Sequence, residues 1–279
     1  MNTSLIHSKT KDHFKTGEEF SLVWNTDHDM LITTPQPSVE KLSYYYESEN
    51  YISHNDDAKG VMAFLYRTVK RRSLKNKISL IESRLGTKGS LLDVGAGTGE
   101  FCKVAFDNNW KVEGVEPSKV ALKFANEKGI KMYTSIENVV DKKYDVITLW
   151  HVLEHLPNLD DVIKKLSDLL KPNGVLIIAV PNYNSFDAGY YKSFWAAFDV
   201  PRHLWHFSKE SIPRLFKESF KVESIKPMWF DSFYVSLLSE KYKSGSGFSI
   251  KALFVGLISN VKAIFTKEYS SVVYCLRKG

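Results

Sequence analysis

The chain has 279 residues, with 38 lysines and arginines, 32 aspartates and glutamates, a formal net charge of +6 and two cysteines. At about 150 residues per domain, this length fits one large domain or a domain with a substantial extension. An apolar fraction of 43% is enough to bury a core and excludes disorder by composition. No apolar run approaches the ~18 residues of a membrane span, and two distant cysteines allow no disulfide framework. We therefore expect a soluble cytoplasmic protein.

The positive charge is concentrated in two segments. Residues 59–88 carry +8 and residues 240–279 carry +5, whereas residues 1–58 carry −6 and residues 89–239 carry −1. A nucleic-acid-binding protein more often spreads basic residues over a face and has a recognisable binding motif. We find no such motif and expect no nucleic-acid partner.

The residues ahead of position 89 divide into an extension and a basic helix. Residues 1–58 have weak periodicity, whereas residues 61–85 have apolar side chains three to five positions apart, which predicts a long amphipathic helix. Its charged side chains are Arg67, Lys70, Arg71, Arg72, Lys75 and Lys77. A solvated face is the default interpretation of these charges, and docking to an anionic substrate or lipid headgroup is the alternative.

From residue 89 onward, short apolar runs alternate with amphipathic stretches. Strands separated by helices in this way indicate a mostly parallel sheet that is covered on both faces. We expect strands at residues 90–94, 111–115, 131–134, 144–150, 175–180, 220–228 and 271–276. We expect helices at residues 100–108, 118–128, 160–170 and, within an insertion, at about 250–265.

The most specific motif is a glycine turn that ends the first of these strands, with glycines at positions 95, 97 and 99. Gly95 and Gly97 allow a tight turn and a close approach to a ligand, because a Cβ would block both. Ligands of such sheets bind at the carboxyl ends of the strands. Glu116 ends the next strand, 23 positions after Asp93. A carboxylate there can hold two ribose hydroxyls.

The spacing of the turn distinguishes among nucleotide sites. A dinucleotide site has G-x-G-x-x-G facing a pyrophosphate, whereas this chain has G-x-G-x-G preceded by Asp93. An acidic side chain there repels a pyrophosphate but suits S-adenosylmethionine, which carries a sulfonium and an ammonium and no phosphate. On these residues the chain resembles the class I S-adenosylmethionine-dependent methyltransferases over about residues 86–230. The alternative is a turn that serves packing alone.

The resemblance implies S-adenosylmethionine as the cofactor and carries site residues over to this chain. The first cofactor motif is Asp93, Gly95, Gly97 and Gly99. Glu116 is expected to hold the ribose, and Ile136, after the third strand, to pack against the adenine ring. Trp150 and His151 follow the fourth strand and are expected near the methionine end or the acceptor.

The resemblance also implies an α/β fold with a Rossmann-like, seven-stranded, mostly parallel sheet and helices on both faces. An N-terminal helical extension and a C-terminal helical insertion are added to it. We expect the extension at residues 1–58, the basic helix at 59–88 and the methyltransferase domain at 89–279, with the insertion at about 231–268.

Residues 151–155, His-Val-Leu-Glu-His, match a zinc-peptidase pattern, H-x-x-E-H, in which two histidines one turn apart bind metal beside a glutamate base. That mechanism needs a sustained helix, whereas Pro157 disfavours one here. The segment also resembles the motif after the fourth strand of the ubiquinone-biosynthesis O-methyltransferases. Zinc hydrolysis through His151, Glu154 and His155 is therefore a remote alternative. We expect no metal.

A second histidine-rich segment, residues 195–208, follows the fifth strand and can reach over the carboxyl edge of the sheet. Methyl transfer mainly needs positioning and exclusion of water, but a hydroxyl acceptor also benefits from a base. The candidate catalytic residues are His151, His203 and His206. Bracing of the loop by Arg202 and the histidines is the alternative. The segment resembles a loop found in a bacterial subgroup linked with cell-envelope glycan or lipid modification.

Residues 44–54, with three consecutive tyrosines, also resemble that subgroup. A cysteine-bearing zinc knuckle often precedes this segment in the relatives, but residues 1–58 contain no cysteine. We therefore expect a degenerate extension without zinc. Tyr45, Tyr51 and His54 either close over the cofactor pocket or pack in a core or lid.

Taken together, these patterns predict methyl transfer from S-adenosylmethionine to a small-molecule or glycan- or lipid-linked acceptor, at oxygen by preference. Nitrogen- and carbon-methylating enzymes share the cofactor half. A non-catalytic S-adenosylmethionine-binding scaffold protein is the rival interpretation. The apolar insertion is open to three interpretations: a substrate cover, a dimer face or a peripheral membrane contact. The oligomeric state is left open.

Overall fold

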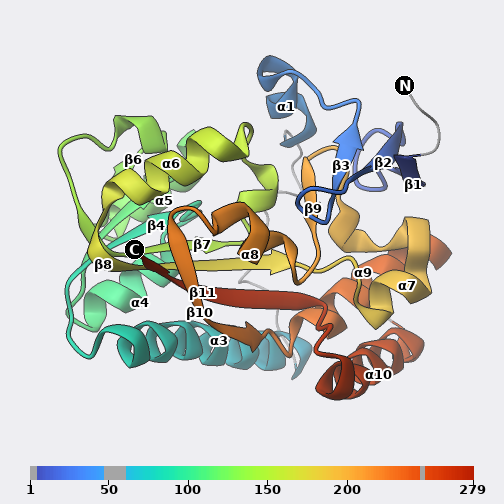
Figure 1. The fold of residues 1–279 in the computed structure, drawn as a ribbon. Coiled ribbons are helices and arrows are strands. Elements are labelled where there is room, and N and C mark those ends of the chain that lie inside the picture. Colours follow the sequence, from blue (N-terminus) through green and yellow to red (C-terminus); the bar gives the residue numbers. More distant parts are fainter. Residues whose placement is uncertain (1–4, 47–60, 246–248) are drawn as a thin grey trace.

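The structure is a computed structural model that describes residues 5–46, 61–245 and 249–279. Within these residues, seven strands form a central sheet in the order β10-β11-β8-β7-β4-β5-β6 (Figure 1). Strands β4, β5, β6, β7 and β8 are parallel to one another, whereas β11 runs antiparallel to both β8 and β10. Their bounds are β4 (Ser90–Val94), β5 (Lys111–Val115), β6 (Lys131–Tyr133), β7 (Tyr144–Trp150), β8 (Leu170–Pro181), β10 (Phe220–Pro227) and β11 (Ser271–Lys278). The predicted Rossmann-like sheet is confirmed.

Helices cover both faces of this sheet, and α3 crosses the face opposite α6 (Figure 1). Their bounds are α3 (Val61–Leu85), α4 (Glu100–Asp107), α5 (Lys119–Glu127), α6 (Leu159–Leu169) and α8 (Ser211–Phe216). Short 3-10 helices are η2 (Ile136–Asn138), η3 (Leu153–His155), η4 (Lys192–Phe194) and η5 (Ala196–Phe198). The long helix predicted at residues 61–85 is present as α3.

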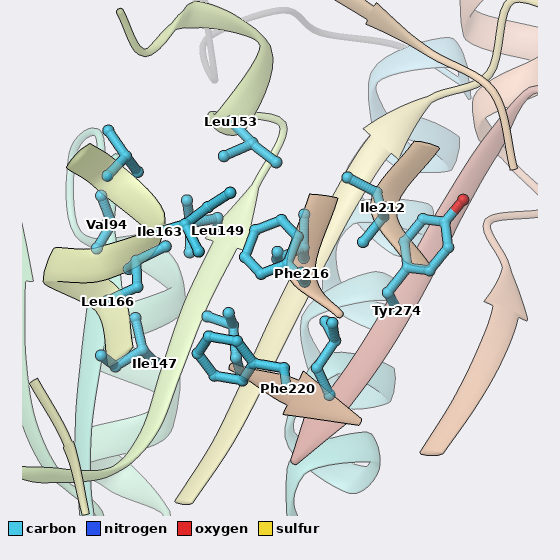
Figure 2. Close-up of a cluster of buried hydrophobic side chains, with 14 of the residues drawn as sticks. Val94, Ile147, Leu149, Leu153, Ile163, Leu166, Ile212, Phe216, Phe220 and Tyr274 are labelled. Carbon is cyan, nitrogen blue, oxygen red and sulfur yellow. The ribbon is translucent and has the colours of Figure 1, made fainter. Parts of the chain in front are cut away.

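Alternate side chains of the strands enter two apolar clusters, one on each face. Leu149 of β7 joins the cluster under α6 and α8, where the rings of Phe216 and Phe220 meet edge to face (Figure 2). Val146 of the same strand joins the cluster under α3 and α4, which contains Ile81. Burial on both sides explains why the parallel strands are nearly continuous apolar runs in the sequence.

The described part of the extension, residues 5–46, has three strands and one short helix, which corrects the helical extension expected at residues 1–58. The strands are β1 (Ile6–Lys11), β2 (Glu19–Asn25) and β3 (Met30–Thr34), and α1 (Val39–Tyr46) follows them. A fourth strand, β9 (Trp205–Phe207), comes from the histidine-rich segment and pairs with β3. Because this small antiparallel sheet is completed by a strand far away in the sequence, local periodicity does not reveal it.

Arg202 fixes the histidine-rich segment to the extension. Its buried guanidinium donates hydrogen bonds to Asp12 Oδ1 at 2.9 Å and to the Asp199 carboxylate at 2.7 and 3.0 Å. It also donates to the backbone oxygen of Tyr45 at 3.1 Å. Since a buried charge is costly unless it is paired and hydrogen-bonded, these bonds together hold the two segments in one arrangement.

Within the described residues, the insertion between β10 and β11 contains α10 (Ile250–Thr266), which is the predicted apolar helix, and α9 (Asp231–Ser244), which was not predicted. Both helices pack against α7 (Phe186–Tyr191). Buried Asp187 of α7 accepts hydrogen bonds from Trp195 Nε1 at 2.8 Å, Ser259 Oγ at 2.6 Å and Ser270 Oγ at 2.7 Å. This carboxylate ties the insertion to the sheet. None of the described helices is long and apolar enough to span a membrane.

Candidate active site

The turn after β4 has a backbone that requires glycine. Gly95, Gly97 and Gly99 have φ angles of +74°, +54° and +74°, a region that other residues rarely adopt. A Cβ on Gly95 would lie 2.3 Å from Val152 Cγ2, so this position is closed by packing. A Cβ on Gly97 would meet nothing within 4 Å. Gly97 therefore borders open space at the carboxyl end of β4, where a ligand can approach.

Glu116, directly after β5, is oriented toward this turn by the backbone. One carboxylate oxygen, Oε2, accepts a hydrogen bond from Gly97 N at 2.9 Å, and Oε1 accepts one from Ser118 N at 2.8 Å. Each oxygen keeps a further lone pair for a ligand hydroxyl. Ile136 begins η2 after the neighbouring strand β6 and is buried in the same apolar cluster as Val115 of β5.

Asp93 of β4 lies buried beneath the glycine turn. Oδ1 accepts a hydrogen bond from Thr148 Oγ1 at 2.6 Å, and Cys102 Sγ lies 3.6 Å from Oδ2. Burial raises the pKa of Asp93 to about 6, although the Thr148 hydrogen bond and the Lys77 charge act in the opposite direction. The side chain thus supports the turn from inside and places negative charge beneath it.

Lys77 of α3 also lies near Trp150 and Asp93, whereas the sequence suggested for it only a charge on the basic helix. Its Nζ lies 4.3 Å from the centroid of the Trp150 ring, and the indole Nε1 of Trp150 is buried without a hydrogen-bond partner among the described residues. Burial lowers the pKa of Lys77, whereas the charges of Asp93 and Asp231 raise it. The sequence does indicate that Lys77 faces the sheet, because it lies three positions after Leu74, on the apolar side of α3.

His151 follows β7 and lies between two carboxylates. Its Nε2 is 3.0 Å from Asp231 Oδ2, and its Nδ1 is 3.5 Å from Glu154 Oε1. Burial lowers the pKa of His151, but Asp231 and Glu154 outweigh this effect and raise it to about 10. Asp231 begins α9, so the insertion reaches the site, which the sequence did not indicate.

The H-x-x-E-H pattern does not lie on a sustained helix. His151 has a φ of +58°, and only the 3-10 turn η3 follows before the chain extends at Leu156. Glu154 is 1% exposed, and the ring of His155 lies with its centroid 4.5 Å from that of His203. The fold therefore brings the segment after β7 against the histidine-rich segment.

His203 and His206 are both less than a tenth exposed. His203 Nδ1 donates to the backbone oxygen of Ala197 at 2.8 Å, and His206 Nε2 is 2.9 Å from Thr33 Oγ1 of the small sheet. Burial lowers the pKa of His206 well below its ordinary value. Both rings are therefore buried within the histidine-rich segment and hydrogen-bonded to their surroundings.

The tyrosine segment is only partly described. Tyr45 is buried and its hydroxyl donates to Glu18 at 2.6 Å, which is a packing role. Tyr46 lies with its hydroxyl 2.8 Å from His155 Nδ1. Tyr51 and His54 lie outside the described residues.

The strand order, the glycine turn and Glu116 together define a Rossmann-like domain of the class I methyltransferase type. A family model described as "Methyltransferase domain" matches residues 66–223. The chain belongs to this methyltransferase domain family.

The curated relatives that this chain matches include proteins named ubiquinone biosynthesis O-methyltransferase. The protein from Actinobacillus pleuropneumoniae serotype 5b (strain L20) is 36% identical over 106 residues, which cover 33% of this chain and 45% of the relative. The protein from Rickettsia prowazekii (strain Madrid E) is 30% identical over 142 residues, which cover 47% and 56%. The chain thus spans about half the length of the curated relatives it matches.

Solved structures show the same fold at low sequence identity. Geranyl diphosphate C-methyltransferase from Streptomyces coelicolor A3(2) has a TM-score of 0.56 and 13% identity, and the match covers 86% of this chain and 97% of that chain. The plantazolicin methyltransferase BpumL has a TM-score of 0.54 and 18% identity, with coverage of 85% and 93%.

Proposed function

We propose that this chain transfers a methyl group from S-adenosylmethionine to an oxygen of a small-molecule or glycan- or lipid-linked acceptor. The observation that carries this proposal is the pairing of the open glycine turn with the Glu116 carboxylate, held by Gly97 N at 2.9 Å. Oxygen as the acceptor atom is supported by the name of the curated relatives. Cys102 and Cys275 are free thiols, which fits the reducing cytoplasm that we propose as the location.

The residues of the site fit the cofactor chemically. Glu116 would hold the ribose hydroxyls, Gly97 leaves room for the cofactor beside the backbone, and Ile136 would border the adenine. Lys77 and Trp150 lie where the methionine end would be expected, and Lys77 is a cation suited to a carboxylate. The bound cofactor supplies an electrophilic methyl group on a sulfonium.

A hydroxyl acceptor must lose its proton when its oxygen is methylated, so the site needs a group that takes this proton. We assign to His151 the role of accepting this proton, because His151 is the most exposed of the three candidate histidines, with its side chain 34% accessible. Asp231, 3.0 Å from Nε2, orients the ring. The Nδ1 contact with Glu154 is long, at 3.5 Å, which leaves this nitrogen for the acceptor.

The His151 assignment has a pH signature. Because the pKa of His151 is raised to about 10, the ring carries a proton at neutral pH, and methyl transfer should accelerate as the pH rises toward 10. Asp231→Asn removes one of the carboxylates that raise this pKa and should move the acceleration toward lower pH. An unchanged pH profile in this variant would contradict the assignment.

An acceptor panel tests the proposed function. Phenolic quinone precursors and envelope sugars are incubated with the chain and S-adenosylmethionine, and release of S-adenosylhomocysteine is measured. We expect turnover with one acceptor class and loss of it in Glu116→Ala. Saturable cofactor binding without turnover of any acceptor would favour the scaffold interpretation instead.

Peripheral contact with an anionic membrane through α10 is the partner that we propose for the insertion. This helix lies at the periphery of the molecule (Figure 1) and buries one face against α9 and α7. Its other face exposes Phe254, Leu257, Ile258, Val261, Ile264 and Phe265. The exposed lysines Lys251 and Lys262 border this face, which favours anionic headgroups.

Sedimentation with lipid vesicles tests this contact. We expect binding to phosphatidylglycerol-containing vesicles but not to pure phosphatidylcholine, and a roughly tenfold loss in Phe265→Ser, because one buried apolar side chain contributes about 1.5–3 kcal/mol. Phe106→Ser, at another exposed phenylalanine on α4, is the matched control. Equal binding by both variants would refute the assignment to α10.

A further inference from the structure

The carboxylate of Glu154 is buried without the hydrogen bonds that a buried charge needs. The residue is 1% exposed, and neither Oε1 nor Oε2 has a hydrogen-bond partner among the residues that the structure describes. The nearest positive group is His151, whose Nδ1 is 3.5 Å from Oε1. Protonated His151 offsets the charge of this carboxylate without a hydrogen bond, so both oxygens keep lone pairs for a metal ion, and a buried carboxylate is costly without such partners.

Two imidazoles lie beside this carboxylate. One nitrogen each from His155 and His203 and one Glu154 oxygen all lie within 4.8 Å of one another. Ligand atoms about 2.1 Å from a tetrahedral ion are about 3.4 Å apart, so small side-chain rotations bring the three atoms onto one ion. The cluster joins η3 to the histidine-rich segment, which the sequence separates widely.

The hydrogen bonds around both rings select the nitrogen that would bind a metal. His203 Nδ1 lies 2.8 Å from the backbone oxygen of Ala197, and His155 Nδ1 lies 3.1 Å from the backbone oxygen of Arg202. A carbonyl oxygen only accepts, so both contacts are hydrogen bonds when Nδ1 carries the proton, and in that tautomer the lone pair is on Nε2. A carbonyl that fixes the tautomer in this way is the usual partner of a metal-binding histidine.

Two other side chains, Asp199 and Tyr46, lie near the imidazoles of this cluster. His203 Nε2 is 4.0 Å from Asp199 Oδ2, beyond hydrogen-bonding distance. The hydroxyl of Tyr46 lies 2.8 Å from His155 Nδ1, on the side of the ring away from Nε2. His203 Nε2 thus has no hydrogen bond to Asp199, and the Tyr46 contact is made by Nδ1 of His155, not by Nε2.

We propose that Glu154, His155 and His203 bind one divalent transition-metal ion, for which zinc is the natural probe. Two imidazoles and one carboxylate are a donor set that suits zinc, whereas magnesium and calcium prefer oxygen ligands alone. Three protein ligands leave a coordination position open, as in catalytic rather than structural zinc sites.

This proposal departs from the expectation of no metal. The sequence pattern joined Glu154 and His155 to His151 along a helix, but that helix is not formed, and the fold supplies His203 as the third donor instead. The site does not depend on the proposed methyl transfer, because metal binding is measured without cofactor or acceptor.

Zinc content per chain is the first test. The full chain is treated with chelator, dialysed against zinc and assayed by elemental analysis and calorimetry. We expect one equivalent of zinc, retained by His206→Ala, a buried histidine of the same segment outside the cluster. Glu154→Gln and His203→Ala should lower the affinity for zinc by at least about tenfold. Wild-type chain without saturable zinc, or equal affinity in all three variants, would overturn the proposal.

Cobalt absorption keeps the test decisive if a variant fails to fold. Folding is checked by circular dichroism, and the wild-type chain is titrated with cobalt(II). Intense visible bands of a four-coordinate nitrogen and oxygen site support the cluster, and zinc should abolish them. A spectrum of hydrated cobalt alone would overturn it.

Discussion

Glu116→Gln tests the ribose site at its central side chain. The substitution preserves size but leaves one oxygen where the carboxylate has two, and those two accept from Gly97 N at 2.9 Å and Ser118 N at 2.8 Å. In the variant an amide N–H group faces one of these backbone donors. The ribose hydroxyls also lose a charged acceptor.

The expected loss follows from the value of such bonds. A hydrogen bond to a charged group contributes about 1.5–3 kcal/mol, so loss of one should weaken binding of S-adenosylmethionine and S-adenosylhomocysteine roughly 10- to 150-fold. Isothermal titration calorimetry measures both affinities. Glu137→Gln is the matched control, because this exposed glutamate lies in η2, at the neighbouring strand end. An affinity of Glu116→Gln within twofold of the wild type would refute the ribose assignment.

Two further predictions concern stability. Gly95→Ala should lower the free energy of unfolding, measured in urea, by about 1–3 kcal/mol more than Gly129→Ala. The two positions share a positive φ, but only at Gly95 does a Cβ lie 2.3 Å from Val152 Cγ2. Equal losses in the two variants would contradict this clash. The raised pKa of His151 adds stability that is complete below about pH 6.5 and is lost as the pH rises through about 10. Between pH 7 and 10 the free energy of unfolding of the wild type should therefore fall by about 1 kcal/mol more than that of Asp231→Asn, after allowance for exposure of the ring. The same fall with pH in both proteins, measured by urea unfolding, would contradict the interaction of His151 with Asp231.

The core of the fold could be predicted from local pattern. The strands at residues 90–94, 111–115 and 144–150 have the predicted bounds. Ser118 caps α5, with its hydroxyl accepting from Ala121 N. The fifth strand differs, since β8 begins at Leu170 rather than at the expected residue 175.

The parts that the sequence did not predict depend on distant partners. Thr33 of β3 forms a hydrogen bond with His206 of β9, and the two strands pair with each other. Because the partners are far apart in the sequence, the pattern of either segment alone does not reveal this pairing. The contact between Asp231 and His151 joins the start of α9 to the residue after β7, and the local pattern of neither segment indicates it. Lys77 is part of a basic run, and its position near Trp150 follows from which face of α3 meets the sheet. Tertiary placement, not residue type, decides these roles.

Saturable binding of S-adenosylmethionine to the wild-type chain tests the central claim most directly. Calorimetry should give one site per chain, with competition by S-adenosylhomocysteine and none by NAD, because the turn with Asp93 and Glu116 suits a cationic nucleoside rather than a pyrophosphate. Absence of detectable S-adenosylmethionine binding, or competition by NAD at similar concentration, would contradict it.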